Sequence, residues 1–325
     1  MAEVLVTIDT ELSSRLHRHG ASLGENLARS IAGKAGDAAY GVGWQMDMLE
    51  RAGLKAVFFV DPMPALAHGS DFLAPMIAPM LARGHEVQLH SHTEWLEWAS
   101  HAPVGGRARN IGDFDLAEQI TVLTLARDLL TSAGAPRPTA FRAGNYGADD
   151  RTIAALATLG IRWDSSVNIG CPDDSCRVSR KTHAPVDLGG VVELPVSGLL
   201  DRPGHFRPAQ ICALSGWEMR AALRHAAAGE APFVIVTHSF EMLSRDRERP
   251  NRMVMRRFRA MCEEIARHPG LQSVGFRDLD PAEVLARSRA ERPLLAANRV
   301  RTAGRMVEQA IATALYERPA RPSRA

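Results

Sequence analysis

Short apolar runs that end directly in acidic, basic or imidazole side chains recur along this chain of 325 residues. Four polar clusters follow such runs, and they centre on Asp9, His90, Arg142 and His238. In barrels and other α/β folds, the ends of parallel strands bring side chains of this kind together at one rim. Acids, histidines and an arginine are also the groups that a metal-assisted hydrolase needs. The pattern therefore predicts an enzyme with its site at one rim.

Apolar segments of strand length alternate with segments of helical periodicity, which is typical of α/β folds. We expect strands at residues 4–8, 56–60, 85–89, 139–142, 162–164, 191–195, 233–237 and 272–276. We expect helices at 72–82, 115–133, 149–159 and 217–228, and a further helix capped by Asn251. Residues 12–40 are polar and too long for an ordinary connection, so they predict an inserted loop that could cover the mouth of the site as a lid.

The composition narrows the class of protein further. The 39 basic and 37 acidic residues leave a formal net charge of +2, so the charge does not indicate a nucleic-acid-binding protein. Apolar runs fall short of the roughly 20 residues that span a bilayer. The chain opens on a strand and leaves no room for a signal peptide, and four cysteines suit a reducing compartment. We therefore expect a cytoplasmic protein without a transmembrane segment.

Five segments resemble, in wording and order, the polysaccharide deacetylase family, also called the NodB-homology family or carbohydrate esterase family 4. VTIDTE (6–11) resembles the first motif of that family, and VFFV (57–60) its second-strand signature, ATFFV. GHEVQLH (84–90) is similar to the GHEIGNH sequence that leads into the metal motif. FRAGNYG (141–147) resembles the arginine motif, and VTH (236–238) the final histidine motif. The resemblance extends from residue 4 to about residue 280.

The resemblance implies an α/β fold of the distorted (β/α)7 barrel type. We expect a single catalytic domain over residues 1–290, with the inserted loop after its first strand. A C-terminal helical extension is expected over residues 291–325. Its last residues, from Arg318 to Arg324, are rich in proline and arginine and predict a flexible tail.

The family pattern usually has two adjacent aspartates, the first as catalytic base and the second as metal ligand. The resemblance assigns the base to Asp9, whereas Thr10 stands in the second place and the next acid is Glu11. Residues two apart on a strand face the same way, so Glu11 could reach the same cavity as Asp9 and bind the metal. The alternative is that Glu11 is a surface charge at the end of the strand.

The histidine motif of the family has two histidines four residues apart. The first would be His90, but the position four residues later is Glu94, and His92 lies between them. A helical turn would put His90 and Glu94 on one face, whereas a continuing strand would do so for His90 and His92. Either set suits a divalent metal, with Zn²⁺ the first choice and Mn²⁺, Co²⁺ or Ni²⁺ as alternatives.

The resemblance assigns two further catalytic roles. Arg142 would pair with Asp9 and hold it ionised and oriented, although it could equally be a structural arginine between two loops. His238 would act as the general acid for the departing amine. We also consider Asp164 a catalytic residue, because its carboxylate could hydrogen-bond His238 and raise the pKa of the imidazole.

Three residues are expected to contact the substrate. The resemblance places the backbone donor for the oxyanion near Asn145 or Tyr146, in a loop one residue longer than the usual RPPYG form. Trp95 follows the histidine motif, and its flat apolar ring could stack on a sugar face; packing beneath the loop is the alternative.

These observations predict a metal-dependent hydrolase that removes an N-acetyl group from a sugar. A cytoplasmic location favours a nucleotide-linked or lipid-linked precursor of a surface polysaccharide, such as an O-antigen or capsule, over a finished polymer. One alternative is an amidohydrolase that acts on a small non-sugar amide. The other is a binding or scaffold protein with a degenerate site, which the residues Thr10 and Glu94 suggest.

Overall fold

The computed structural model describes residues 1–105, 109–171, 175–288 and 293–317. The strands of its main sheet are Ala2–Thr10 (β1), Val57–Val60 (β4), Glu86–Ser91 (β5), Ala140–Ala143 (β6), Trp163–Asp164 (β7), Val186–Asp187 (β8), Val192–Glu193 (β9), Phe233–His238 (β12) and Leu271–Ser273 (β13). They pair in the order β12-β1-β4-β5-β6-β7-β9-β8, and β13 pairs with the start of β1. All pairs are parallel except β8 with β9.

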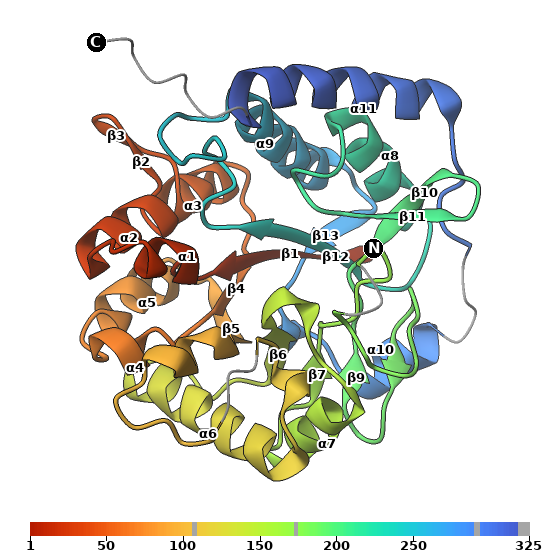
Figure 1. Cartoon of the computed structure of the whole chain (residues 1–325). Helices are drawn as coiled ribbons and strands as arrows, with labels where there is room; N and C mark the ends of the chain where they lie inside the picture. The colour runs from red at the N-terminus through yellow and green to blue at the C-terminus, as the bar shows by residue number, and fades with distance from the viewer. Residues whose placement is uncertain (106–108, 172–174, 289–292, 318–325) are drawn as a thin grey trace.

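Helices surround the curled sheet (Figure 1). They are Val42–Arg51 (α3), Ala65–His68 (α4), Leu73–Ala82 (α5), Leu116–Ser132 (α6), Asp150–Thr158 (α7), Gly216–Ala226 (α8), Arg252–Arg267 (α9) and Pro281–Arg287 (α10). The predicted cap of α9 is confirmed, because the Asn251 side chain accepts a hydrogen bond from the backbone N–H of Val254. Asp115 closes the start of α6 in the same way, in a reciprocal capping box with Glu118.

The two faces of strand β1 have different surroundings. Its residues Val4, Val6 and Ile8 join the large hydrophobic cluster that the helices share. Leu5 faces the other way, into a smaller buried cluster with Phe59 and its neighbours. Because side chains alternate along a strand, Asp9 continues the inner row that Leu5 begins. The inner face of the sheet is therefore apolar at one end and polar at the carboxyl end of the strands.

The sheet does not close by regular pairing, because β8 and β12 form its two ends. An irregular segment lies along β12 instead: the Ser197 N–H donates to the Val234 carbonyl at 3.1 Å, and the Val236 N–H donates to the Ala209 carbonyl at 2.9 Å. This segment carries the hairpin of Gly198–Arg202 (β10) and His205–Pro208 (β11), which the sequence did not indicate. The predicted distorted (β/α) barrel is confirmed.

Residues 12–40 are not the long loop that we expected. They form the helices Ser14–Arg18 (α1) and Leu23–Ser30 (α2), followed by a hairpin of Lys34–Ala35 (β2) and Ala38–Ala39 (β3). Ser13 caps α1, and Ser22 with Glu25 forms a capping box at α2. Gly33 permits the close return of this hairpin, because its φ is +63° and a Cβ there would lie 2.4 Å from the backbone of Gly41.

The helix Arg299–Ala312 (α11) packs across α8 at the edge of the molecule (Figure 1). Arg305 anchors it through ion pairs with Asp201 at 2.8 Å and Glu218 at 3.1 Å. The proposed domain boundary at residue 290 and the predicted tail from Arg318 onward lie outside the described residues. Every helix in the described ranges is too short or too polar to cross a membrane.

Candidate catalytic and metal site

Strand register assembles the site. In the pairing of β1 with β12, Asp9 lies opposite His238, and in the pairing of β5 with β6, His90 lies opposite Arg142. Since these strands are parallel, their carboxyl ends meet at one rim. The side chains from four distant parts of the sequence therefore come together as predicted, on the inner face of the sheet.

Glu11, His90 and His92 converge on one point. The Glu11 Oε2 atom lies 3.2 Å from His90 Nε2 and 2.5 Å from His92 Nε2. One donor atom from each of the three residues lies within 4.8 Å of the others, which is the spacing of ligands around a single cation. A carboxylate with two imidazoles is a donor set for Zn²⁺ and other transition metals.

In both imidazoles, the Nδ1 atom, on the side away from Glu11, contacts a fixed partner. His90 Nδ1 donates to the backbone carbonyl of Arg142 at 2.7 Å, and His92 Nδ1 lies 3.2 Å from Glu94 Oε1. With Nδ1 held in this way, each Nε2 atom faces Glu11, and Nε2 is the atom through which each imidazole would bind a cation. Glu94, one of the two alternatives for the third ligand, therefore lies behind His92, and the geometry favours His92 at the cation.

The charges around this cluster also fit a cation. Burial raises the pKa of Glu11, but the charge of His92 and the hydrogen bonds from both imidazoles outweigh it and hold the pKa well below its usual range. Asp61 lies close by: its Oδ1 atom accepts hydrogen bonds from the N–H groups of Met63 and His92, whereas its buried Oδ2 atom has no partner among the described residues. Burial raises the pKa of Asp61 to about 7. A cation at Glu11, His90 and His92 would offset this buried negative charge.

Arg142 and Asp9 form a fully enclosed ion pair. The guanidinium is 0% exposed, and its NH1 atom lies 2.7 Å from Asp9 Oδ1. Thr7 and Ser165 accept the remaining hydrogen bonds of the guanidinium, which also packs 4.3 Å from the centre of the Phe59 ring. The expected pairing is thus present, and it fixes the direction of the Asp9 carboxylate.

His238 lies between two carboxylates. Its Nε2 atom is 3.9 Å from Asp9 Oδ2, and its Nδ1 atom is 2.8 Å from Glu241 Oε1. Burial lowers the pKa of the imidazole, but the hydrogen bond with Glu241, its charge and the charges of Asp9 and Glu11 raise it to about 9. Glu241 is a residue that our sequence reasoning missed, although its position three residues after His238 was a usable signal.

The predicted hydrogen bond between Asp164 and His238 is wrong. Asp164 Oδ1 instead accepts from the Ser166 hydroxyl at 2.6 Å, and its neighbour across the β7–β9 pairing is Glu193. Burial, together with the charge of Asp164, holds the pKa of Glu193 well above its usual range, so this pair retains a proton. The Asp164–Glu193 pair lies where β7 pairs with β9. The carboxylate that orients His238 is instead Glu241.

The substrate contact predicted for Trp95 is also wrong. The indole is 0% exposed and is enclosed by the rings of His17, His68 and Trp98, at centroid distances of 5.3 to 5.9 Å. A ring that is covered on its faces cannot stack on a sugar, so packing beneath the loop is its role.

Asn145 and Tyr146 directly follow the strand that carries Arg142. Both have a φ of 56°, in the left-handed region that non-glycine residues rarely adopt. Strained backbone of this kind is concentrated at functional sites. The expected role of this turn as the oxyanion donor stays a prediction.

Comparison with known proteins places this site in a family. The family model described as polysaccharide deacetylase matches residues 45–163. No curated protein sequence matches the chain significantly. A putative polysaccharide deacetylase from Mycobacterium smegmatis has a similar structure, with a TM-score of 0.59 and 17% identity over 91% of this chain and 94% of that one. A 4-alpha-glucanotransferase from Thermococcus litoralis gives a TM-score of 0.50 and 10% identity over 91% of this chain and 41% of that one.

Residues 45–163 thus carry the sequence pattern of the polysaccharide deacetylase family. The chain is accordingly a hydrolase of the deacetylase class, and its substrate class is carbohydrate. The predicted family and reaction class are therefore confirmed. The two solved structures share its fold at low identity.

Proposed function

We propose that the chain is a metal-dependent sugar N-deacetylase, with Glu11, His90 and His92 as the cation ligands. The single observation that carries the proposal is the convergence of this donor set with Asp9 and His238 at one rim. A divalent cation held there would polarise the acyl carbonyl and acidify a water molecule. A degenerate binding protein would have no need for two imidazoles whose Nε2 atoms both face one carboxylate.

The residues of this chain divide the proton transfers between them. Asp9, kept ionised by Arg142, would take the proton of the attacking water. His238, kept protonated by Glu241, would give a proton to the departing amine of the sugar. The His238 Nε2 atom lies 3.9 Å from Asp9 Oδ2, so the base and the acid lie next to each other at the rim.

We further propose that the substrate is a nucleotide-linked or lipid-linked precursor of a surface polysaccharide, handled in the cytoplasm. All four cysteines are free, which supports a reducing compartment. Zn²⁺ is the proposed cation, because two imidazoles and one carboxylate with open positions are a common catalytic zinc set.

The test begins with metal removed by a chelator and each of Zn²⁺, Mn²⁺, Co²⁺ and Ni²⁺ added back. Acetate release is then measured from a panel of N-acetyl sugars and from small non-sugar amides. We expect metal-dependent release from sugars, lost in Glu11→Gln and retained in Glu263→Gln, which removes an exposed carboxylate on α9. Release from the non-sugar amides alone, or stoichiometric metal with no hydrolysis of any substrate, would refute the proposal.

A further inference from the structure

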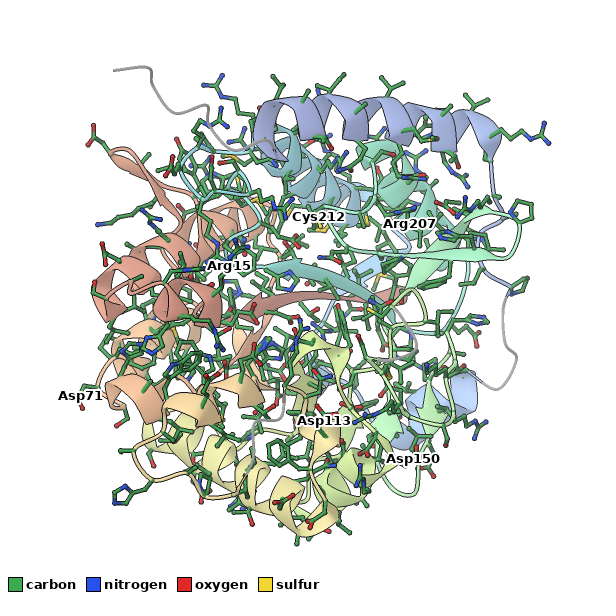
Figure 2. All side chains as sticks on the ribbon, viewed as in Figure 1. Arg15, Asp71, Asp113, Asp150, Arg207 and Cys212 are labelled. Atoms are coloured by element: carbon green, nitrogen blue, oxygen red, sulfur yellow. The ribbon has the colours of Figure 1, made fainter. Side chains whose placement is uncertain are left out.

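A second polar cavity opens beside the proposed catalytic site. It has a volume of about 640 Å³, within the range of small-molecule sites. One wall comes from α1 and the residues around it, and the other from the loop after β12. The lining residues are Ser13, Arg15, Leu16, His19, Arg245, Asp246 and Arg247. Figure 2 labels Arg15, a residue of α1 that lines this cavity.

Short contacts connect this cavity to the catalytic residues. The Arg247 guanidinium lies 3.9 Å from the centre of the Phe240 ring, and that ring is 5.3 Å from the imidazole of His238. On the other wall, Ser13 follows the proposed ligand Glu11 by two residues. A substrate whose acetamide contacts Asp9 and His238 can therefore extend into the cavity.

The cavity carries uncompensated positive charge. Its three arginines and one aspartate leave a net charge of +2 with His19 neutral. Within the ranges that the structure describes, no carboxylate lies within 4.0 Å of the side chains of Arg15, Arg245 or Arg247. Asp246 is the one carboxylate of the lining, and its nearest cation is Arg249, at 3.9 Å from Oδ2, while its Oδ1 atom accepts hydrogen bonds within its own loop.

Arg247 is held in place without a direct ion pair, although the negative charge of Glu11 acts on it from a distance. Its NH1 atom donates to the Ser30 hydroxyl at 2.5 Å, its guanidinium packs on Phe240, and its backbone has a φ of 59°. Burial lowers its pKa to about 10, so it remains charged at neutral pH. A cation that is positioned, partly buried and unpaired gains most from an incoming anion.

From this arrangement we infer that the cavity binds the phosphate or diphosphate ester group of the sugar substrate. A diphosphate diester carries two negative charges, which match the net charge of the lining, and arginine forks bind phosphate oxygens in pairs. A neutral finished polysaccharide has no group that would use this cavity. The inference rests on the proposed deacetylase function and selects an anionic, carrier-linked sugar as its substrate class.

The kinetic test uses one N-acetyl sugar in three forms: as its nucleoside diphosphate ester, as a short polyprenyl diphosphate ester, and as the neutral methyl glycoside. In Arg247→Gln and in Arg15→Gln we expect KM for the diphosphate forms to rise about 10- to 100-fold, the effect of losing one charged hydrogen bond. We expect kcat, and all kinetics of the methyl glycoside, to stay unchanged. Arg256→Gln, which removes an exposed arginine on α9, is the matched control.

Comparison of the nucleoside diphosphate ester with the polyprenyl diphosphate ester shows which of the two carriers the cavity prefers. A higher kcat/KM for the nucleoside diphosphate form, or for the polyprenyl form, supports the anion site and identifies its carrier. Equal kcat/KM for the diphosphate forms and the methyl glycoside overturns the inference, as does an equal loss for all three forms in Arg247→Gln. Because Arg15 is exposed, Arg15→Gln keeps the test valid if Arg247→Gln fails to fold.

A binding measurement separates this inference from the proposed activity. Titration calorimetry with inorganic pyrophosphate should show binding to the wild-type protein and to Arg256→Gln, weakened about 10-fold or more in the Arg15→Gln variant and decreasing with added salt. Absence of pyrophosphate binding to the wild-type protein would refute the anion site. Pyrophosphate binding without acetate release from any sugar would instead refute the deacetylase function and leave the anion site standing.

Discussion

Two groups of histidine and carboxylate side chains lie at the same rim, and they are arranged for different ions. In the first group, two imidazoles direct their Nε2 atoms at one carboxylate, Glu11, while their Nδ1 atoms are held from behind. In the second group, one imidazole, His238, lies between the carboxylates of Asp9 and Glu241. The first therefore gathers three possible ligand atoms within reach of one cation, and the second holds a single imidazole in its protonated form.

The comparison shows that residue type alone does not assign a histidine to metal binding or to acid catalysis. His92 and His238 each have a carboxylate beside both ring nitrogens. They differ in what else faces the inner carboxylate: a second imidazole, His90, faces Glu11, whereas the guanidinium of Arg142 faces Asp9. Four substitutions test the roles assigned to the two groups.

The largest effect is expected for His90→Ala. Loss of one of three ligands leaves an inadequate site, so stoichiometric metal and activity should disappear together. Elemental analysis of the purified variant and acetate release are the measurements. His101→Ala, which removes an exposed histidine, should retain both. Full metal content in His90→Ala would show that the first group does not bind the cation.

Asp9→Asn should lower kcat by roughly 10²–10⁴, the usual contribution of a positioned general base. The metal content should remain close to that of the wild type, because Asp9 pairs with Arg142 and lies outside the ligand set. The control is Asp71→Asn, an exposed residue that Figure 2 labels. Near-normal turnover would remove Asp9 from the mechanism.

Glu94→Gln should weaken metal affinity by about 10- to 100-fold, the usual effect of losing a residue that orients a ligand. Saturating metal should restore most of the activity, since the three ligands remain. Metal titration followed by acetate release measures both quantities, with Glu263→Gln as the control. If activity stays lost at saturating metal, Glu94 contributes more than the orientation of His92.

Glu241→Gln should have the smallest effect at neutral pH and a clear effect on the pH profile. The pKa of His238 is raised to about 9, so activity that needs its protonated form should be lost as the pH rises through about 9. Without the carboxylate, this alkaline limb should move to lower pH. The measurement is kcat against pH for both proteins. An unmoved limb would show that Glu241 does not set the protonation of His238.

Much of the fold and half of the site could be predicted from the sequence. Apolar runs with polar ends located β1, β5, β6 and β12, and the family resemblance assigned the residues that follow them. The pairing of Arg142 with Asp9 was likewise predicted from the family resemblance. These features depend on local patterns and on the side-chain alternation of strands.

The features that could not be predicted depend on contacts between distant segments. Asp164 bonds within the β7–β9 region because the register of two very short strands places Glu193 beside it. Trp95 is buried because His17 and His68, from separate helices, close over its ring. The structure of residues 12–40 was missed because short capped helices carry little periodicity.

The two groups at the rim also differ in how far apart in the chain their members lie. Glu11 and His90 are 79 positions apart, whereas the hydroxyl of Thr7, beside Asp9, bonds a carbonyl of β12 that is 228 positions away. Closing the longer loop is entropically more costly, and contacts of high sequence separation slow folding. During synthesis the cation ligands emerge from the ribosome well before the imidazole acid. The cluster of Glu11, His90 and His92 is built on the β1-β4-β5 part of the sheet, whereas His238 reaches the rim only when β12 pairs with β1.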